Sequence, residues 1–127
     1  MTDDAPGVEP KRLPMPTGCV LWRQPDLMTT PRGRFETVKT YTHESHLYRA
    51  LVKCCECGQL YFYEFYERVD WDDGDDAQYS TYIPVPDASE AQTMKDLNVV
   101  GLLQYTPRLQ WDHPTGKSPS VRWIGKD

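Results

Sequence analysis

The sequence lacks any long apolar run. No stretch of its 127 residues approaches the roughly 20 consecutive apolar residues that a transmembrane helix requires. The opening stretch, MTDDAPGVEPKRLPMP, contains no apolar signal region. We therefore expect a soluble, cytoplasmic protein without membrane contact.

The short motifs of common enzyme chemistries are also missing. The sequence contains no G-x-S-x-G, no phosphate-binding loop and no H-E-x-x-H. Glu64 and Glu67 lie three positions apart in a predicted strand, so their side chains point to opposite faces and cannot work as a paired acid and base. His113 lies in a predicted loop. The sequence therefore indicates a protein that is not an enzyme.

Aliphatic residues are scarce, whereas aromatic residues make up 12% of the chain, with eight Tyr and four Trp. A chain of this length is about one domain. Because each aromatic side chain buries a large area, we expect a core built largely from aromatic rings whose polar tips reach water or a partner.

Proline and apolar alternation divide the chain. Residues 1–16 carry four prolines and indicate an extended N-terminal arm. Residues 17–127 are predicted to form a single α+β domain, an antiparallel β-sheet with one or two helices. Strands are expected at 18–23, 35–41, 47–53, 59–69, 79–85 and 121–124, and the proline-containing segment 24–34 is expected to be a loop.

One helix start is well marked. Asp87 and Glu90 have the spacing of an N-cap and its N3 partner, which predicts a helix over 88–97. The following segment, VVGLLQY at 99–105, suits either a helix or a strand, and Gly101 weakens both. The aromatic segment 59–69 has no fully polar face, so we expect a central strand covered on both sides for part of its length.

Three of the four cysteines lie in one short turn between two predicted strands. The stretch Cys54-x-x-Cys57-Gly58 resembles one knuckle of a zinc ribbon or rubredoxin-type finger. The resemblance covers these residues and the flanking strands only. It implies a zinc-ribbon-like β-hairpin in which two thiolates face one metal and the glycine lets the chain reverse with backbone amides directed at the sulfur atoms.

A tetrahedral zinc site needs four nitrogen or sulfur ligands, or three with a water. Cys19 is the natural additional thiol, and His46, on the strand that enters the turn, is the first choice among the histidines. His43, Cys55 and His113 are weaker alternatives. The predicted metal ligands are therefore Cys54, Cys57, Cys19 and His46, with Zn²⁺ in a structural role.

Two interpretations of this turn stay open. It either holds a structural metal or is a metal-free turn with packed cysteines, since free cysteine is commonly buried. A redox role fits less well, because a thioredoxin-like motif begins a helix and a strand follows here. A disulfide between the adjacent Cys54 and Cys55 would be strained.

Negative charge is concentrated in one stretch. Seven acids and one arginine lie between Glu64 and Asp76, a local charge of -6 in a chain whose net charge is -5. The connection at its end has the sequence DWDDGDD. The predicted strand before it has about eleven residues at roughly 3.3 Å each, so we expect about 30 Å between this acidic turn and the cysteine turn.

The acidic turn allows three interpretations. The EF-hand pattern fails, because Gly74 falls at position 5 of the loop and Thr81 at position 12. A solvated hairpin turn is one remaining interpretation. The other is a binding surface for a basic protein, because an indole ringed by carboxylates is typical of a contact hot spot. Its predicted partner-binding residues are Trp71, Asp70, Asp72, Asp73, Asp75 and Asp76.

These features favour a small, non-enzymatic interaction protein that engages a basic protein partner, for example an immunity-type inhibitor of a nuclease toxin. One alternative is a zinc-finger-like nucleic-acid-binding or complex-assembly subunit, and another is a small metalloenzyme. Nucleic acid is the less suitable ligand, because phosphate binding needs clustered cations. The bases Arg32, Arg34, Arg49 and Lys53 are interpreted as ordinary solvated positions. The oligomeric state is left undetermined by the sequence.

Overall fold

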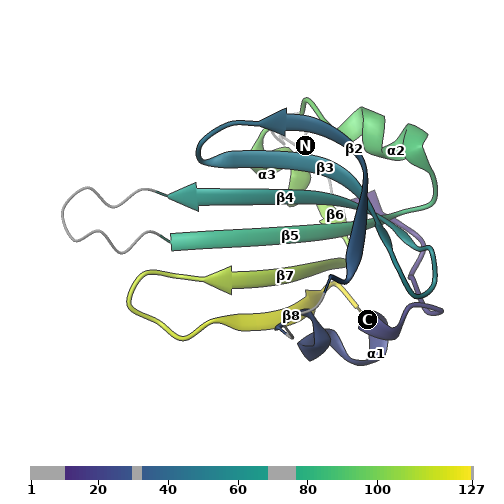
Figure 1. The fold of residues 1–127 in the computed structure, drawn as a ribbon, viewed down its shortest axis with the longest axis horizontal. Coiled ribbons are helices and arrows are strands. Elements are labelled where there is room, and N and C mark those ends of the chain that lie inside the picture. Colours follow the sequence, from purple (N-terminus) through teal and green to yellow (C-terminus); the bar gives the residue numbers. More distant parts are fainter. Residues whose placement is uncertain (1–10, 30–32, 69–76, 127) are drawn as a thin grey trace, which may run out of the picture.

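The computed structural model describes residues 11–29, 33–68 and 77–126. Its main feature is a six-stranded antiparallel sheet in the order β2-β3-β4-β5-β7-β8, and a second, two-stranded parallel sheet pairs β1 with β6 (Figure 1). In chain order the elements are β1 Lys11–Arg12, α1 Val20–Arg23, a 3-10 helix η1 Pro25–Thr29, β2 Phe35–His43, β3 Leu47–Cys54, β4 Leu60–Arg68, β5 Ala77–Val85, α2 Ala88–Met94, α3 Val99–Leu102, β6 Tyr105–Thr106, β7 Arg108–His113 and β8 Ser120–Ile124.

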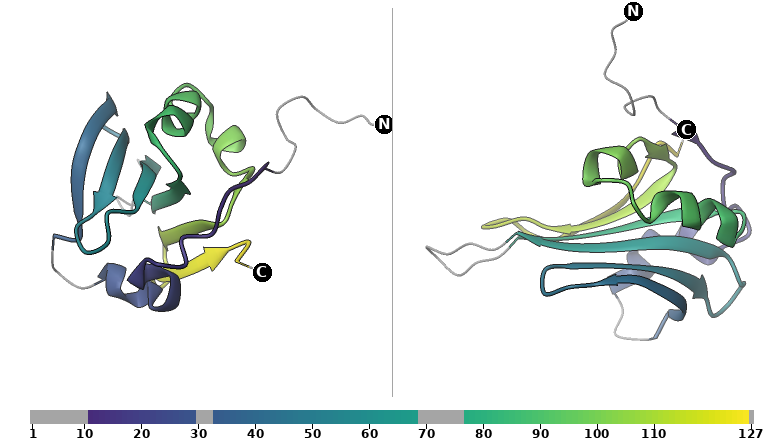
Figure 2. Two further views of the ribbon diagram at one scale, coloured as in Figure 1. Left: turned by 90° about the vertical axis from the view of Figure 1, so that its right-hand side faces the viewer. Right: turned by 90° about the horizontal axis from the view of Figure 1, so that it is seen from above.

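Both faces of the large sheet are covered. On one face α2 and α3 pack over a core that includes Phe62 and Ile83. On the other face α1 and η1 pack over a core that includes Tyr61 and Leu109. Figure 2 shows the two helical layers on opposite sides of the twisted sheet. The α+β architecture and the antiparallel sheet are therefore as the sequence predicts.

Strand β4 illustrates why the sequence pattern is informative. Successive side chains of a strand point to opposite faces. Tyr61 faces one core and Phe62 faces the other, and both are fully buried. The expectation of a central strand covered on both sides is confirmed over this part of β4.

Helix α2 begins where the capping pattern places it. The Asp87 side chain accepts a hydrogen bond from the Glu90 backbone N–H at 3.0 Å, which satisfies one of the free amides of the first turn. The helix ends at Met94, earlier than predicted. The ambiguous segment after it forms both elements, α3 and then β6, and Asn98 caps α3 through a bond from Gly101 N–H at 2.8 Å.

Two predicted elements are wrong. The segment 18–23 is not a strand, because Val20–Arg23 forms the single turn of α1 and buries Leu21. The segment 24–34 is not wholly a loop, because Pro25 opens η1. Proline suits the first position of a helical turn, where its missing N–H would have no partner. Strand β7 was also missed, and His113 is its last residue.

The part of the predicted arm that the structure describes is docked. Lys11 and Arg12 pair in parallel with Tyr105 and Thr106, and the Leu13 N–H donates to the Thr106 carbonyl at 2.7 Å. Leu13 also packs on the core beneath α2 and α3. Among the described residues, no helix has the length and apolar character needed to span a membrane.

Candidate metal centre

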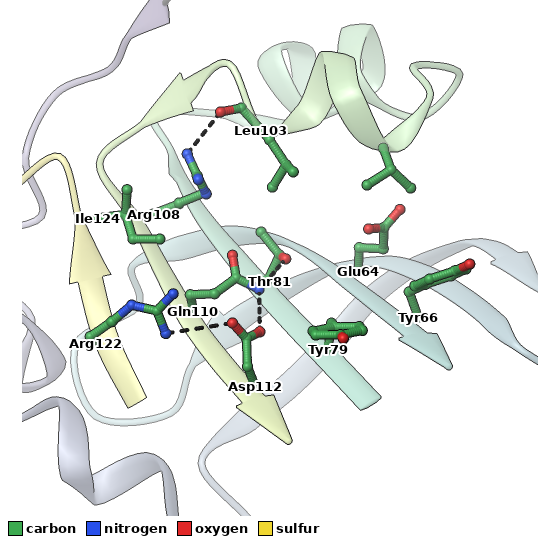
Figure 3. Close-up of a pocket in the computed structure, with 11 residues that line it drawn as sticks. Glu64, Tyr66, Tyr79, Thr81, Leu103, Arg108, Gln110, Asp112, Arg122 and Ile124 are labelled. Atoms are coloured by element: carbon green, nitrogen blue, oxygen red, sulfur yellow. Dashed lines mark hydrogen bonds and ion pairs between the residues drawn. The ribbon is translucent and has the colours of Figure 1, made fainter. Parts of the chain in front are cut away.

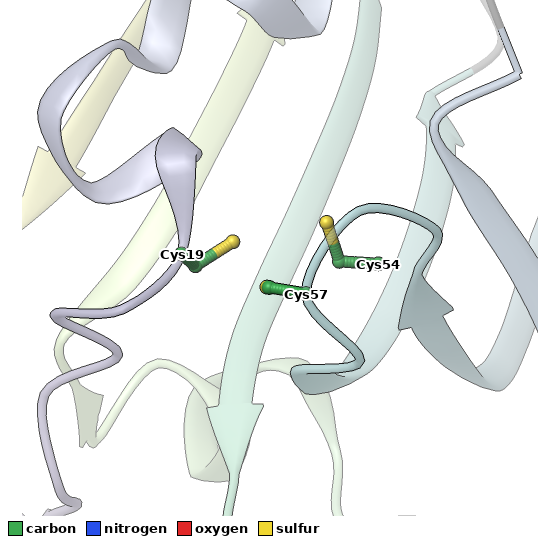
Figure 4. A group of neighbouring side chains, drawn as sticks. All are labelled: Cys19, Cys54 and Cys57. Carbon is green, nitrogen blue, oxygen red and sulfur yellow. The ribbon is translucent and has the colours of Figure 1, made fainter.

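Three cysteines from two distant parts of the chain meet at one end of the large sheet. Cys54 is the last residue of β3, Cys57 lies in the turn that leads to β4, and Cys19 precedes α1. Their Sγ atoms all lie within 4.8 Å of one another, so the group could hold a metal ion. Figure 4 shows Cys19 reaching across to the turn that carries the other two.

The turn itself is shaped by Gly58. Its φ of 81° lies in the left-handed region that glycine adopts without a Cβ penalty, and its N–H donates to the Cys54 carbonyl at 2.9 Å. Burial raises the pKa of the Cys54 thiol, but hydrogen bonds from the backbone N–H groups of Cys57 and Glu56 lead the opposing effects, and the net pKa is lowered. Backbone amides directed at a sulfur atom favour its thiolate, which is the form that binds metal.

Cys19 is held in place on the face of the sheet that α1 covers. It is the N-cap residue of α1, and its Sγ accepts a hydrogen bond from the Tyr61 hydroxyl of β4 at 3.2 Å. The α1 segment is tied to β8, because Trp123 Nε1 donates to the Leu21 carbonyl at 2.8 Å. Burial raises the pKa of the Cys19 thiol to about 12, although the Tyr61 hydroxyl and the Leu21 N–H partly oppose this. A metal would have to displace that proton.

The three thiols differ in their access to solvent. Cys19 and Cys54 are buried, whereas Cys57 is exposed. Cys19 and Cys57 line a hollow of about 360 Å³, together with Gly18, Gly58, Gln59, Leu60, Val85 and Pro86. None of these lining residues is a carboxylate or a histidine. The residues that line this hollow therefore supply no carboxylate or imidazole beside the thiols.

The structure does not bring His46 to the three cysteines. His46 precedes β3, whereas Cys54 is its last residue, so the full length of the strand separates them. Its Nδ1 instead lies 3.1 Å from Glu67 Oε1. His46 is the histidine nearest to the turn along the strand that enters it, but an eight-residue extended strand spans roughly 26 Å, so His46 lies at the opposite end of the sheet.

The weaker alternatives also lie outside the group of three. Cys55 is exposed, and its N–H donates to the Arg34 carbonyl at 3.0 Å. The His43 ring packs edge-on against Tyr48 at 5.4 Å. His113 pairs with Gln78 at the end of β7.

The predicted partner-binding residues, Trp71 and the five aspartates at 70, 72, 73, 75 and 76, lie outside the described residues. Two acids of the same stretch are described. Glu64 is buried against Arg49, and Glu67 lies beside His46 and Gln78. The charge of Glu64 is therefore neutralised inside the fold, and the interpretation of Arg49 as a solvated base is wrong because Arg49 is only 5% exposed.

A row of polar side chains was missed by the sequence analysis. Strand register aligns Arg49, Glu64, Thr81, Gln110 and Arg122 across five adjacent strands on one face of the sheet. The first four are buried. In the sequence, each of these residues is a polar side chain within a strand segment. Only the strand register shows that they are neighbours.

Comparison with known proteins assigns no relatives to this arrangement. The chain matches no protein-family model, no curated protein and no solved structure.

Proposed function

We propose that this protein is a small, non-enzymatic interaction protein whose fold is held together by a structural Zn²⁺ bound to Cys19, Cys54 and Cys57. The observation that carries the proposal is the convergence of the three sulfur atoms within 4.8 Å. Tetrahedral thiolate coordination is typical of zinc, and a fourth ligand would be water or a small molecule that enters from the hollow beside Cys57.

A metal at this position would have a structural effect. It would join the segment before α1 to the β3–β4 turn, which are separated by more than thirty residues in sequence. Structural zinc sites can contribute on the order of 10 kcal/mol at neutral pH, because a formed site rarely exists in the unfolded chain. The lack of an acid or base among the residues lining the hollow favours this role over catalysis.

The zinc proposal is tested by metal analysis of the purified protein and of two single variants. We expect about one zinc per wild-type chain, loss of the metal in Cys57→Ser, and retention in Cys55→Ser, because Cys55 is an exposed neighbour outside the group. Chelation should lower the free energy of unfolding of the wild-type protein and of Cys55→Ser by about 3 kcal/mol or more. It should leave Cys57→Ser unchanged. Equal zinc in the two variants, or wild-type protein that takes up no zinc when it is supplied, would contradict the proposal.

The proposed partner is a basic protein that contacts the acidic stretch at 70–76. The sequence supports this through five aspartates and Trp71 within seven residues. This stretch follows β4, which ends at Arg68, and precedes β5, which begins at Ala77. Arg68 is at the opposite end of β4 from the cysteine turn. The metal and the partner would therefore occupy separate regions, and an inhibitor of a nuclease toxin is one concrete form of this function.

Affinity capture at low and high salt tests the partner proposal. Trp71→Ala, and a variant with the aspartates at 72, 73, 75 and 76 changed to asparagine, should lose the captured partner while remaining folded. The matched control changes four exposed acids elsewhere to amides, namely Asp26, Glu36, Glu44 and Asp96. It should retain the partner. Capture that is unaffected by either acidic-stretch variant, or a captured partner that is acidic or a nucleic acid, would overturn this assignment.

A further inference from the structure

A second concave site lies on the opposite face of the sheet from Cys19. It is a cleft of about 350 Å³ between α3 and the strands β7 and β8 (Figure 3). This volume lies within the range of small-molecule sites. Its apolar walls include Val99 and Leu103 on one side and Ile124 on the other, and the rings of Tyr66 and Tyr79 form one end. The cysteine centre does not use any of these residues.

Two polar atoms in this cleft are buried without a hydrogen-bond partner among the described residues. They are Oε1 of Gln110 and Nε of Arg108, which lie two positions apart on β7 and so on the same face. Gln110 is only 6% exposed, and its Nε2 is already bound to Thr81 Oγ1 at 2.8 Å and Asp112 Oδ1 at 2.9 Å. In Figure 3 its oxygen points away from Asp112. A buried polar atom left unpaired costs about 1–3 kcal/mol, so a ligand group that paired with either atom would recover that cost.

The charges on this side of the cleft favour an anion. Arg108 donates to the carbonyls of Leu103 and Tyr105 at 2.8 and 3.2 Å but forms no ion pair with a described carboxylate. Arg122 on β8 lies diagonally opposite Arg108 on β7, because it pairs with Gln110. Its Nη1 lies 3.5 Å from Asp112 Oδ2. Burial, and then the Arg122 guanidinium, lower the pKa of Arg108, while Asp112 opposes them. The Arg122 guanidinium thus repels that of Arg108, and Asp112 is the carboxylate that opposes this effect.

The rest of the cleft is electrically balanced. Glu64 lines its inner end, but Glu64 Oε2 is bound to Arg49 Nη2 at 2.7 Å, and both side chains are buried. The four charged lining groups sum to zero, and Arg49, which pairs with Glu64 from outside the lining, leaves one surplus positive charge shared by Arg108 and Arg122. A monoanion would relieve the repulsion between the two guanidinium groups without overcompensating it.

We propose that this cleft binds a small carboxylate ligand that has an amide N–H next to its carboxylate and an apolar side chain, as in an N-acyl amino acid. The carboxylate would lie between Arg108 and Arg122, the N–H would donate to Gln110 Oε1, and the side chain would contact Val99, Leu103 and Ile124. Bidentate pairing of guanidinium with carboxylate is among the stronger polar contacts in proteins. The apolar walls supply the remaining affinity.

The test is an NMR titration of the full chain with N-acetyl-L-phenylalanine. We expect saturable shifts confined to the amides of β7, β8 and α3, with a dissociation constant of about 1 mM or tighter for a ligand of this size. The neutral N-acetyl-L-phenylalaninamide should bind about tenfold more weakly, because it lacks the charge that Arg108 and Arg122 recognise.

Two surface variants separate the site from general charge effects. Arg122→Gln should weaken binding about tenfold, and Leu103→Glu should abolish it by placing an anion in the cleft. Both side chains are partly exposed, so the fold should be retained, which the unperturbed spectrum checks. Arg23→Gln, an exposed arginine outside the cleft, should bind as wild type.

Three results would overturn the proposal: no saturable shifts, equal binding of the acid and the amide, or unchanged binding by Arg122→Gln. A longer acetylated peptide with the same C-terminal residue should bind no more tightly than the single residue. If the peptide binds more than about tenfold more tightly, the site recognises an extended peptide, and the assignment of a small ligand is wrong. None of these readouts depends on the metal or on the acidic stretch.

Discussion

At the scale of single residues, the most consequential contact is the buried ion pair between Arg49 and Glu64. Glu64 Oε2 accepts from Arg49 Nε at 2.9 Å and from Nη2 at 2.7 Å, and Arg49 Nη1 donates to the Lys95 carbonyl at 3.0 Å. The pair thus joins β3, β4 and the end of α2. Buried ion pairs add little net stability over apolar residues, but removal of one partner leaves a charge in the core.

Loss of one member of this pair should therefore be costly. Arg49→Met should lower the free energy of unfolding by about 3–5 kcal/mol, whereas the double variant Arg49→Met/Glu64→Leu should recover most of that loss. Urea denaturation of the single and double variants measures both effects. The exposed pair of Lys53 and Glu36, at 3.8 Å, is the matched control, and Lys53→Met should cost less than about 1 kcal/mol. A double variant at least as unstable as Arg49→Met would contradict the expectation.

Residue identity was sufficient to choose part of the metal centre. The sequence predicts Cys19 as a further ligand, and the structure places its sulfur beside those of Cys54 and Cys57. His46 was selected by proximity along the chain, and strand length carries it to the far end of β3. The type of a residue shows whether it can bind a metal, but the fold decides whether it lies close to the other ligands.

At the scale of elements, long strands with strong alternation were predictable. β2, β3, β4 and β5 all lie within a few residues of the predicted bounds, because each has eight or nine residues, which is long enough for an alternating pattern to be recognised. The start of α2 was predictable for a different reason. A side-chain cap is a local interaction that depends only on neighbours in sequence.

Short elements could not be predicted in the same way. α1 and α3 have four residues each, which is too few for a periodic pattern. The β-branched and aromatic residues of Val20–Arg23 favour a strand by propensity, yet the segment turns so that Leu21 and Trp22 can pack against the sheet. Tertiary packing overrides local propensity where the local signal covers a single turn.

At the scale of the whole molecule, the buried aromatic core sets a limit on alkaline stability. The rings of Tyr63 and Tyr82 stack at 4.6 Å, and burial raises the pKa of both phenols, most strongly that of Tyr82. Below pH 10 the phenols of Tyr63 and Tyr82 are protonated in both the folded and the unfolded chain, so their ionisation does not reduce the free energy of unfolding. Above pH 10 the unfolded chain releases protons that the folded chain retains, and unfolding becomes more favourable.

We therefore expect the free energy of unfolding to fall steadily as the pH rises through and above 10. Tyr82→Phe removes one of these protons and should flatten that dependence, even if the loss of the hydroxyl makes the variant less stable at neutral pH. Denaturant midpoints measured at about pH 8, 9, 10 and 11 give both slopes. Parallel slopes for the wild-type protein and the variant would show that Tyr82 does not retain its proton in the folded state.

The sequence by itself determined the antiparallel sheet, the cap of α2, the glycine-containing cysteine turn and the chemical suitability of Cys19 as a ligand. Each of these follows from residue types and near neighbours. Only the tertiary structure decided that His46 lies apart from the cysteines, that Arg49 and Glu64 are buried together, and that Arg108, Gln110 and Arg122 line one cleft. There are two physical reasons: strand length separates His46 from the cysteines, and strand register brings together side chains that lie far apart in the chain.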